Sequence, residues 1–193
     1  MPLEKVLEAE NAFLGVCHLE NPELLEKCVE EVSGKLLKNP QIMIYGKVAF
    51  QHRSIGFFSN ESEGYRYSGQ LAASQSLTPN LSQLLECVNQ MFGAKFNGIL
   101  VNQYENGEDS IGAHSDDERY LDTAGVVSVS LGESRTFRIR DKKTKKIVLD
   151  VASDSGKIIF MAGEFQKLFT HEIPTEKKKK NPRISFTFRR HSK

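Results

Sequence analysis

The chain has 193 residues, the length of a single domain with room for a complete hydrophobic core. Its 26 Lys and Arg residues nearly balance its 25 Asp and Glu residues, which excludes a protein that binds nucleic acid through a strongly basic overall charge. Any phosphate-binding surface must therefore come from local patches. We expect one domain, residues 1–193, and a monomeric protein.

The cysteines and the hydropathy of the chain indicate in which cellular compartment the protein works. Cys17, Cys28 and Cys87 are odd in number, lie far apart and form no C-x-x-C pair, which argues against a disulfide framework or a thiolate zinc site. The N-terminal sequence MPLEKVLEAENAF lacks the apolar segment of a signal peptide, and no apolar run approaches the length of a transmembrane helix. We therefore expect an intracellular protein that does not enter a membrane.

Two segments of the first half have the pattern of amphipathic helices. Residues 21–34, NPELLEKCVEEVSG, have Asn at a possible N-cap, Pro at the first helical position and Gly just beyond the end. Residues 78–93, TPNLSQLLECVNQMFG, repeat this order with Thr, Pro and Gly, and carry an apolar stripe wide enough to pack on a sheet. Both segments are predicted to be scaffold helices.

From residue 96 onward the pattern changes to short runs rich in β-forming residues, which predicts a β-sandwich or barrel-like body. Residues 138–147, RIRDKKTKKI, indicate a hairpin with lysines at its tip, and a second lysine run follows at 177–180. Either run can contact phosphates or can simply be a solvated loop. The predicted strands are FNGILVNQY (96–104), GVVSVSLG (125–132), RTFRIR (135–140), KIVLDV (146–151), GKIIFM (156–161) and RISFTFRR (183–190).

The segment NQYENGEDSIGAHSDDE, residues 102–118, combines a histidine with several carboxylates. In an extended chain residues i and i+2 point the same way, so His114 and Asp116 present an imidazole and a carboxylate to one face. A second histidine would complete the set of two His and one carboxylate that non-haem Fe(II) oxygenases use. His171, after an apolar β run, is the candidate. The alternative is a solvated acidic loop with an unrelated histidine.

The last predicted strand has one polar and one apolar face. Arg183 and Arg189 lie six residues apart on the polar face together with Ser185 and Thr187. If that face lines a barrel interior, both guanidinium groups can reach a small dicarboxylate through bidentate contacts. An ordinary surface strand shows the same alternation.

Taken together, these segments resemble the AlkB family of Fe(II)/2-oxoglutarate dioxygenases. The resemblance implies an α+β fold with a double-stranded β-helix (jelly-roll) core in residues 96–193, and N-terminal helices packed on the sheet with a nucleotide-recognition lid in residues 1–95. It also implies Fe(II), 2-oxoglutarate as cosubstrate and dioxygen. The matching pieces, in the family's order, are NQY with Asn102 and Tyr104, HSD with His114 and Asp116, His171, and RISFTFR with Arg183 to Arg189.

Site roles follow from the same resemblance. His114, Asp116 and His171 are implied to be the iron ligands. Arg183 is implied to pair with one carboxylate of 2-oxoglutarate, and Arg189 with the other part of the cosubstrate site. The further cosubstrate contacts implied are Asn102, Tyr104, Ser185 and Thr187.

The resemblance extends into the first half, where IYGK (44–47) and YRYSG (65–69) are similar to segments of the homologues that repair alkylated duplex DNA. The first segment implies that Tyr45 is an aromatic wedge that fills the gap left by a flipped base. The second implies that Tyr67 stacks on that base opposite a metal-ligand histidine. The remaining implied substrate contacts are Arg53, Tyr65, Ser68 and Asp117.

The activity implied by the resemblance is oxidative demethylation of 1-methyladenine and 3-methylcytosine in alkylated nucleic acid, with DNA as the favoured substrate. Decarboxylation of 2-oxoglutarate would be coupled to hydroxylation of the N-methyl group, with release of formaldehyde and succinate. The implied location is the nucleus in a eukaryote and the cytoplasm otherwise. The alternatives are an AlkB-like oxygenase that acts on RNA or on a protein side chain, and a nucleic-acid-binding module without a metal.

Overall fold

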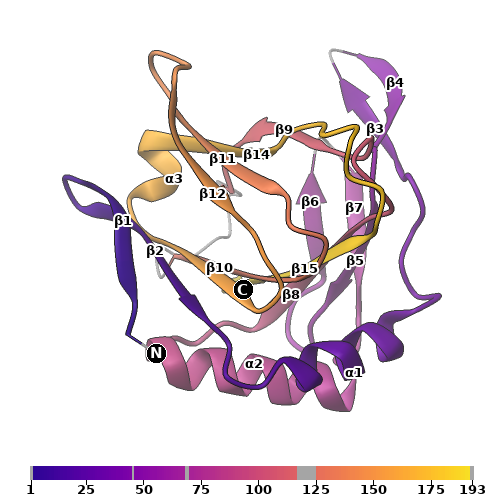
Figure 1. Cartoon of the computed structure of the whole chain (residues 1–193). Coiled ribbons are helices and arrows are strands. Elements are labelled where there is room, and N and C mark those ends of the chain that lie inside the picture. The colour runs from indigo at the N-terminus through magenta and orange to yellow at the C-terminus, as the bar shows by residue number, and fades with distance from the viewer. Residues whose placement is uncertain (1, 45, 68–69, 117–124, 192–193) are drawn as a thin grey trace.

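The fold consists of a large and a small β-sheet, with two helices on the outer face of the large sheet (Figure 1). The computed structural model describes residues 2–44, 46–67, 70–116 and 125–191. The helices are α1 (Pro22–Val32), α2 (Pro79–Phe92) and the short α3 (Phe165–Leu168). The nine-stranded sheet has the order β1 (Glu4–Ala9), β2 (Ala12–His18), β13 (Lys157–Gly163), β10 (Val126–Gly132), β15 (Arg183–Arg189), β8 (Gly98–Tyr104), β5 (Ser54–Phe58), β7 (Gln70–Gln75) and β6 (Gly64–Tyr67).

The four-stranded sheet covers the face of the large sheet opposite the helices, and a two-stranded sheet lies beside the large sheet (Figure 1). The four-stranded sheet has the order β12 (Ile147–Ala152), β11 (Thr136–Asp141), β14 (Phe169–Ile173) and β9 (Ile111–His114). The strands β3 (Gln41–Ile44) and β4 (Lys47–Phe50) form a separate hairpin. This arrangement is the predicted α+β jelly-roll with helices packed on the sheet. No helix in the described part of the chain is both long enough and apolar enough to cross a membrane.

Two apolar layers hold the elements together. One lies between the helices and the large sheet, where Leu84 and Val88 of α2 belong to the same buried cluster as Phe186 and Phe188 of β15. The other lies between the two sheets and includes Met161 of β13 and Phe137 and Ile139 of β11. The large sheet is therefore covered on both faces.

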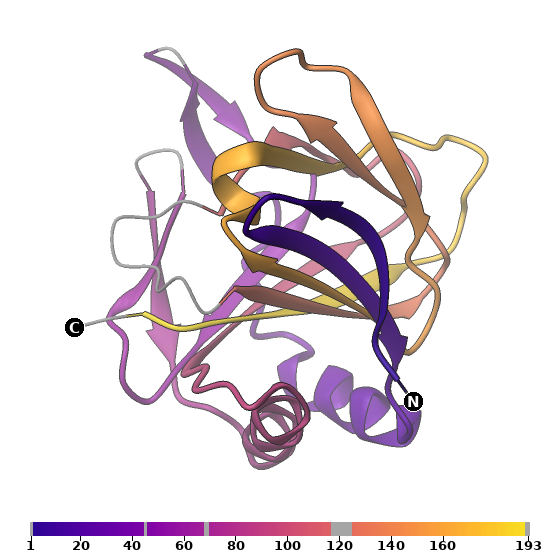
Figure 2. The same ribbon diagram turned by 90° about the vertical axis from the view of Figure 1, so that its left-hand side faces the viewer.

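Strand β15 crosses the middle of the large sheet between β10 and β8 (Figure 2). All seven of its residues are buried, so the surface-strand alternative is wrong. Its apolar face packs toward the helices, and its polar face, with Arg183 and Arg189, lines a cavity between the sheets. Both predicted faces exist, and each has its own buried environment.

The N-terminal residues contribute strands that the sequence did not reveal. Strand β2 pairs with β13, with Cys17 opposite Ile158 and Val16 opposite Ile159, and β1 forms the edge of the large sheet. Strand β2 is buried on both faces, so it lacks the alternation that marks a half-exposed strand. The first 95 residues therefore supply part of the main sheet as well as the predicted helices.

Both predicted helices are present, but their N-caps differ. Thr78 accepts a hydrogen bond from the Leu81 backbone N–H through Oγ1 at 3.4 Å, and α2 ends at Gly93, whose φ of 58° a glycine adopts without strain. Asn21 precedes α1 but makes no side-chain capping bond. Of the two predicted cap residues, Thr78 therefore caps its helix and Asn21 does not.

The difference between the two caps leads to a prediction about stability, for which Asn21 provides the control. Thr78→Ala should lower the free energy of unfolding by about 1 kcal/mol, because the substitution removes a capping acceptor from a partly buried helix end. Asn21→Ala should cost clearly less, since no capping bond is lost. Urea denaturation of the two variants measures both values, and equal losses would contradict this interpretation of the caps.

Candidate metal centre

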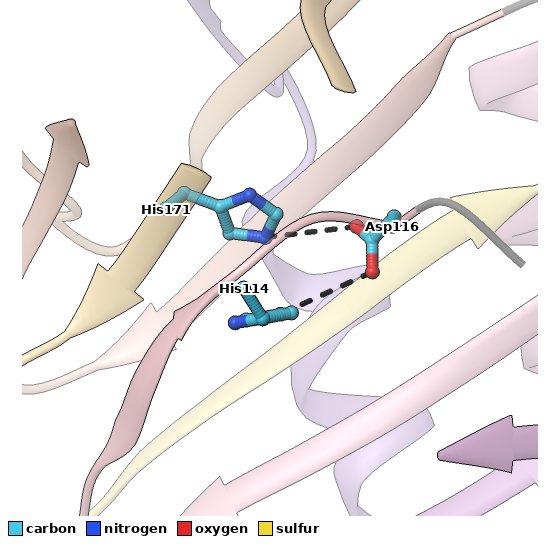
Figure 3. Close-up of side chains that lie close together, drawn as sticks. All are labelled: His114, Asp116 and His171. Carbon is cyan, nitrogen blue, oxygen red and sulfur yellow. Dashed lines mark ion pairs between the residues drawn. The ribbon is translucent and has the colours of Figure 1, made fainter. Parts of the chain in front are cut away.

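Two histidines and one aspartate come together between the sheets (Figure 3). His114 ends β9, and His171 lies directly opposite it on β14 in the antiparallel pair. Asp116 follows two residues after His114. One ligand atom from each of the three residues lies within 4.8 Å of the others. The strand register therefore joins residues that are more than fifty positions apart in the sequence.

The ring nitrogens are arranged for metal binding through Nε2. His171 Nε2 lies 3.6 Å from Asp116 Oδ2, and His114 Nε2 lies 4.0 Å from Asp116 Oδ1. His114 Nδ1 is 2.9 Å from the Gly112 carbonyl oxygen. Because a carbonyl can only accept, this contact places the proton on Nδ1 and leaves the Nε2 lone pair facing the aspartate. Metal-binding histidines are commonly oriented in this way.

Burial and one arginine set the charges of the cluster. Burial lowers the pKa of both imidazoles, and for His171, which also faces His114, to about 3. For Asp116, burial alone would raise the pKa, but the charges around it, with Arg189 foremost, lower it to about 2. Arg189 Nη2 donates to Asp116 Oδ1 at 2.9 Å, and both side chains are almost fully buried. At neutral pH the cluster thus has two neutral imidazoles and one carboxylate.

This donor set fits Fe(II). Two imidazoles and one carboxylate on one side of an octahedral ion leave three positions for other ligands, which is the arrangement of non-haem Fe(II) oxygenases. The carboxylate is already ionised and the imidazoles are already neutral, so no protons need to leave before a divalent metal ion binds.

The backbone that carries Asp116 is held by contacts from the neighbouring elements. The Asp116 backbone N–H donates to Gln166 Oε1 of α3 at 2.9 Å. The preceding residue, Ser115, donates through Oγ to the Phe169 carbonyl oxygen at 3.1 Å. On the other side, the ring of Phe137 stacks on His171 with centroids 5.2 Å apart. These contacts help to position Asp116 and the ring of His171.

Arg183 lies in the same cavity as a buried cation without an ion-pair partner among the described residues. Its Nη2 donates to Ser130 Oγ at 2.9 Å, while Nε and Nη1 have no hydrogen-bond partner in the described part of the chain. Burial lowers the pKa of the guanidinium, and the nearby Tyr104 offsets part of this effect. A buried cation of this kind is costly unless an anion pairs with it. A small carboxylate ligand would supply that anion.

The register of the large sheet aligns the other predicted cosubstrate contacts. Ser185 of β15 lies between Asn102 of β8 and Ser130 of β10, and Thr187 lies opposite Ser128. These residues form rows across three neighbouring strands, and most of them face the cavity. The predicted site residues that line it are Tyr65, Asn102, Tyr104, His114, Asp116, His171, Arg183, Ser185, Thr187 and Arg189.

The remaining predicted substrate contacts are placed only in part. Arg53 is buried just before β5 and donates through Nε to Asn102 Oδ1 at 2.9 Å, which holds it beside the cavity. Tyr67 belongs to β6 by its backbone, but its side chain lies outside the described part of the structure. Tyr45, Ser68 and Asp117 lie outside the described residues altogether.

Sequence reasoning missed several residues that support the site. Ser128 and Ser130 alternate with valines in VVSVSL, and this polar alternation inside a buried strand was a usable signal. Gln166 and Phe137 carried no such signal, because their contacts with Asp116 and His171 depend on how α3 and β11 pack. His171 was expected after a strand, whereas it lies within β14.

Comparisons with known proteins agree with this geometry. The sequence matches the 2OG-Fe(II) oxygenase superfamily over residues 17–189. It is 31% identical to the DNA oxidative demethylase ALKBH2 of Mus musculus over 176 residues, which cover 86% of this chain and 72% of the relative. It is 33% identical to the alpha-ketoglutarate-dependent dioxygenase alkB homolog 3 of Homo sapiens over 120 residues, which cover 58% of this chain and 42% of that protein.

A solved structure, that of OsALKBH1, shares the fold with a TM-score of 0.63 at 15% sequence identity, covering 98% of this chain and 100% of that chain. The match to the ALKBH2 of Bos taurus, at 30% identity, covers 86% of this chain but 62% of the relative's length. The chain belongs to the AlkB family within the 2OG-Fe(II) oxygenase superfamily, whose reactions use Fe(II), 2-oxoglutarate and dioxygen.

The cluster predicts the effect of removing each ligand. His114→Ala, Asp116→Ala and His171→Ala should each weaken Fe(II) binding by more than the roughly 10- to 100-fold that loss of an outer-shell partner costs. Anaerobic titration with Fe(II) measures this. His52→Ala removes an exposed histidine outside the cluster and should bind Fe(II) normally. Unchanged affinity in any of the three ligand variants would exclude that residue from the site.

The position of Arg183 in the cavity leads to a prediction about the affinity for 2-oxoglutarate. Arg183→Lys keeps the positive charge, but an ammonium cannot reproduce the planar set of donors, so the KM for 2-oxoglutarate should rise roughly tenfold to a hundredfold. Arg138→Lys is the matched control, because Arg138 forms its bidentate contact with Asp150 away from the cavity. Succinate release at varied 2-oxoglutarate gives both values, and equal KM values in the two variants would contradict the assignment.

Proposed function

We propose that this chain is an Fe(II)/2-oxoglutarate-dependent oxygenase that removes methyl groups from alkylated nucleobases by oxidation, with DNA as the favoured substrate. The observation that carries the proposal is the His114, Asp116 and His171 cluster, which shares one cavity with the buried cation Arg183. The similarity to proteins named DNA oxidative demethylase supports the choice of nucleic acid as substrate.

In the proposed reaction His114, Asp116 and His171 hold the iron, which supplies the activation of dioxygen. Arg183 binds one carboxylate of 2-oxoglutarate, and Arg189 keeps Asp116 ionised while it faces the other part of the cosubstrate. Tyr104 and the row that contains Asn102, Ser185 and Thr187 complete the cosubstrate pocket. Their common task is to hold the cosubstrate in one orientation and to exclude water.

The atoms balance with one dioxygen molecule per methyl group. One oxygen atom enters succinate while 2-oxoglutarate loses carbon dioxide, and the other enters the N-methyl group. The resulting hydroxymethyl group leaves as formaldehyde: the bond between its carbon and the ring nitrogen breaks, the electron pair returns to the nitrogen, and the hydroxyl proton is released. For 1-methyladenine and 3-methylcytosine this restores the unmodified base. No covalent nucleophile is needed from the protein.

In this proposal the alkylated base enters the side of the cavity that Tyr65 lines. Tyr65 lines the cavity, and the guanidinium carbon of Arg189 lies 4.7 Å from its ring centroid. Arg53 reaches the same region through its contact with Asn102. The roles predicted for Tyr45, Tyr67, Ser68 and Asp117 in base flipping and base contact belong to this proposal. At the tip of β11 and β12, exposed lysines supply a local positive patch for phosphates, which the nearly neutral overall charge does not.

Formaldehyde release from matched oligonucleotides tests the proposal. The same sequence carrying one 1-methyladenine is offered as single-stranded DNA, duplex DNA and RNA, with Asp116→Ala as the control for adventitious iron. We expect release that depends on 2-oxoglutarate and is fastest on a DNA form. A preference for RNA would favour the alternative substrate, and an absence of release from all three, despite normal Fe(II) binding, would overturn the proposed function.

A further inference from the structure

A second cavity lies behind the wall of the metal-binding cavity. It has a volume of about 180 Å³ and is lined mainly by Leu37, Pro40, Gln51, Ile55, Tyr65 and Ala72. Tyr65 also lines the metal-binding cavity, so the two cavities share this side chain as a wall. Nothing in the proposed reaction requires the second cavity.

The shared wall is held in a fixed position. Tyr65 is 3% exposed, and its ring stacks on Phe57 with centroids 6.2 Å apart and an interplanar angle of 26°. Arg189, which also holds Asp116, lies over the same ring. A ligand in the second cavity would therefore contact Tyr65, whose ring lies against Arg189, and Arg189 in turn binds Asp116 of the metal cluster.

Gln51 gives the second cavity a specific polar group. Its backbone is satisfied, because its N–H donates to the Pro40 carbonyl and its own carbonyl accepts from Asn39 Nδ2. Its side chain is buried, with 4% of the residue exposed, and Oε1 has no hydrogen-bond partner among the described residues. Buried polar groups are normally paired, and leaving one unpaired destabilises a fold. The amide oxygen is therefore available to a donor on a ligand.

The shape and chemistry of the cavity fit a nucleobase. Leu37, Ile55 and Ala72 provide apolar walls, and Tyr65 provides an aromatic one. The rim carries exposed apolar side chains, with Leu37 55% and Leu71 43% exposed, which a bound flat ligand would cover. A base offers two apolar faces and, in adenine, cytosine and guanine, an exocyclic amino group that can donate to an amide oxygen.

We propose that this cavity binds a second base of the substrate strand, adjacent to the alkylated base, and that Gln51 accepts a hydrogen bond from its exocyclic amino group. The inference rests on the proposed function, because the first base must enter the metal-binding cavity. Two neighbouring bases would then be separated by the Tyr65 side chain, whose ring is held between Phe57 and Arg189. The affinity of the enzyme for a substrate would then depend on which base lies next to the alkylated one.

Binding of short oligonucleotides tests this without turnover. Fluorescently labelled DNA trinucleotides carry 1-methyladenine in the centre and, on the 5′ or the 3′ side, adenine, unsubstituted purine or an abasic site. For the wild-type protein loaded with Fe(II) and 2-oxoglutarate without oxygen, adenine on one side should bind roughly tenfold more tightly than purine, because purine lacks the amino donor. The abasic site should bind least tightly. Equal binding of adenine and purine on both sides would overturn the proposal.

Three variants assign the preference to Gln51. Gln51→Leu should reduce the ratio of adenine to purine affinities to near one, whereas Gln51→Glu keeps an acceptor and should retain a preference for adenine. Gln90→Leu makes the same chemical change on the exposed surface of α2 and should keep the wild-type ratio. Thermal melting confirms that each variant is folded. A full adenine preference in folded Gln51→Leu would also overturn the proposal.

The same trinucleotides separate this inference from the proposed function. If the wild-type protein discriminates adenine from purine but releases no formaldehyde when oxygen is admitted, the second base site stands and the proposed demethylation fails. If formaldehyde is released at equal rates and affinities whatever the neighbouring base, demethylation stands and the second base site is wrong.

Discussion

The ion pair between Arg189 and Asp116 is the contact on which the site depends. Arg189 belongs to the centre of the large sheet, whereas Asp116 follows an edge strand of the small sheet, and their atoms meet at 2.9 Å with both side chains almost fully buried. The pair keeps the carboxylate ionised beside two neutral imidazoles. It also ties the two sheets together at the point where His114 and His171 face each other, so stability and metal binding share one interaction.

Strand β15 shows how the fold accommodates buried cations. Its apolar side chains pack with α1 and α2, and this burial offsets part of the cost of the two arginines on the opposite face. Arg189 has a carboxylate in the protein itself, whereas Arg183 has none among the described residues and contacts Ser130 and Tyr104. Within the described part of the chain, Arg183 is therefore a buried charge without a counter-ion, which the proposed cosubstrate would neutralise.

Tyr65 connects the two proposals. It lines the cavity that holds the metal ligands and the cavity that contains Gln51, and it is fixed between Phe57 and Arg189. A side chain in this position separates the two proposed base sites, so two adjacent bases would have to leave their stack with each other to enter both.

The sequence by itself determined the local features: the apolar stripes of α1 and α2, the Thr78 cap of α2, the strands β8, β10 to β13 and β15, and the residue types that metal and carboxylate binding need. These follow from propensities and from repeats of two or about four residues, which a chain displays before it folds. Only the tertiary structure decided that His171 pairs with His114, that β1 and β2 join the large sheet, and that Gln51 is buried without a partner. Each of these depends on strand register and packing between distant segments, and no local pattern encodes which distant segment will be the neighbour.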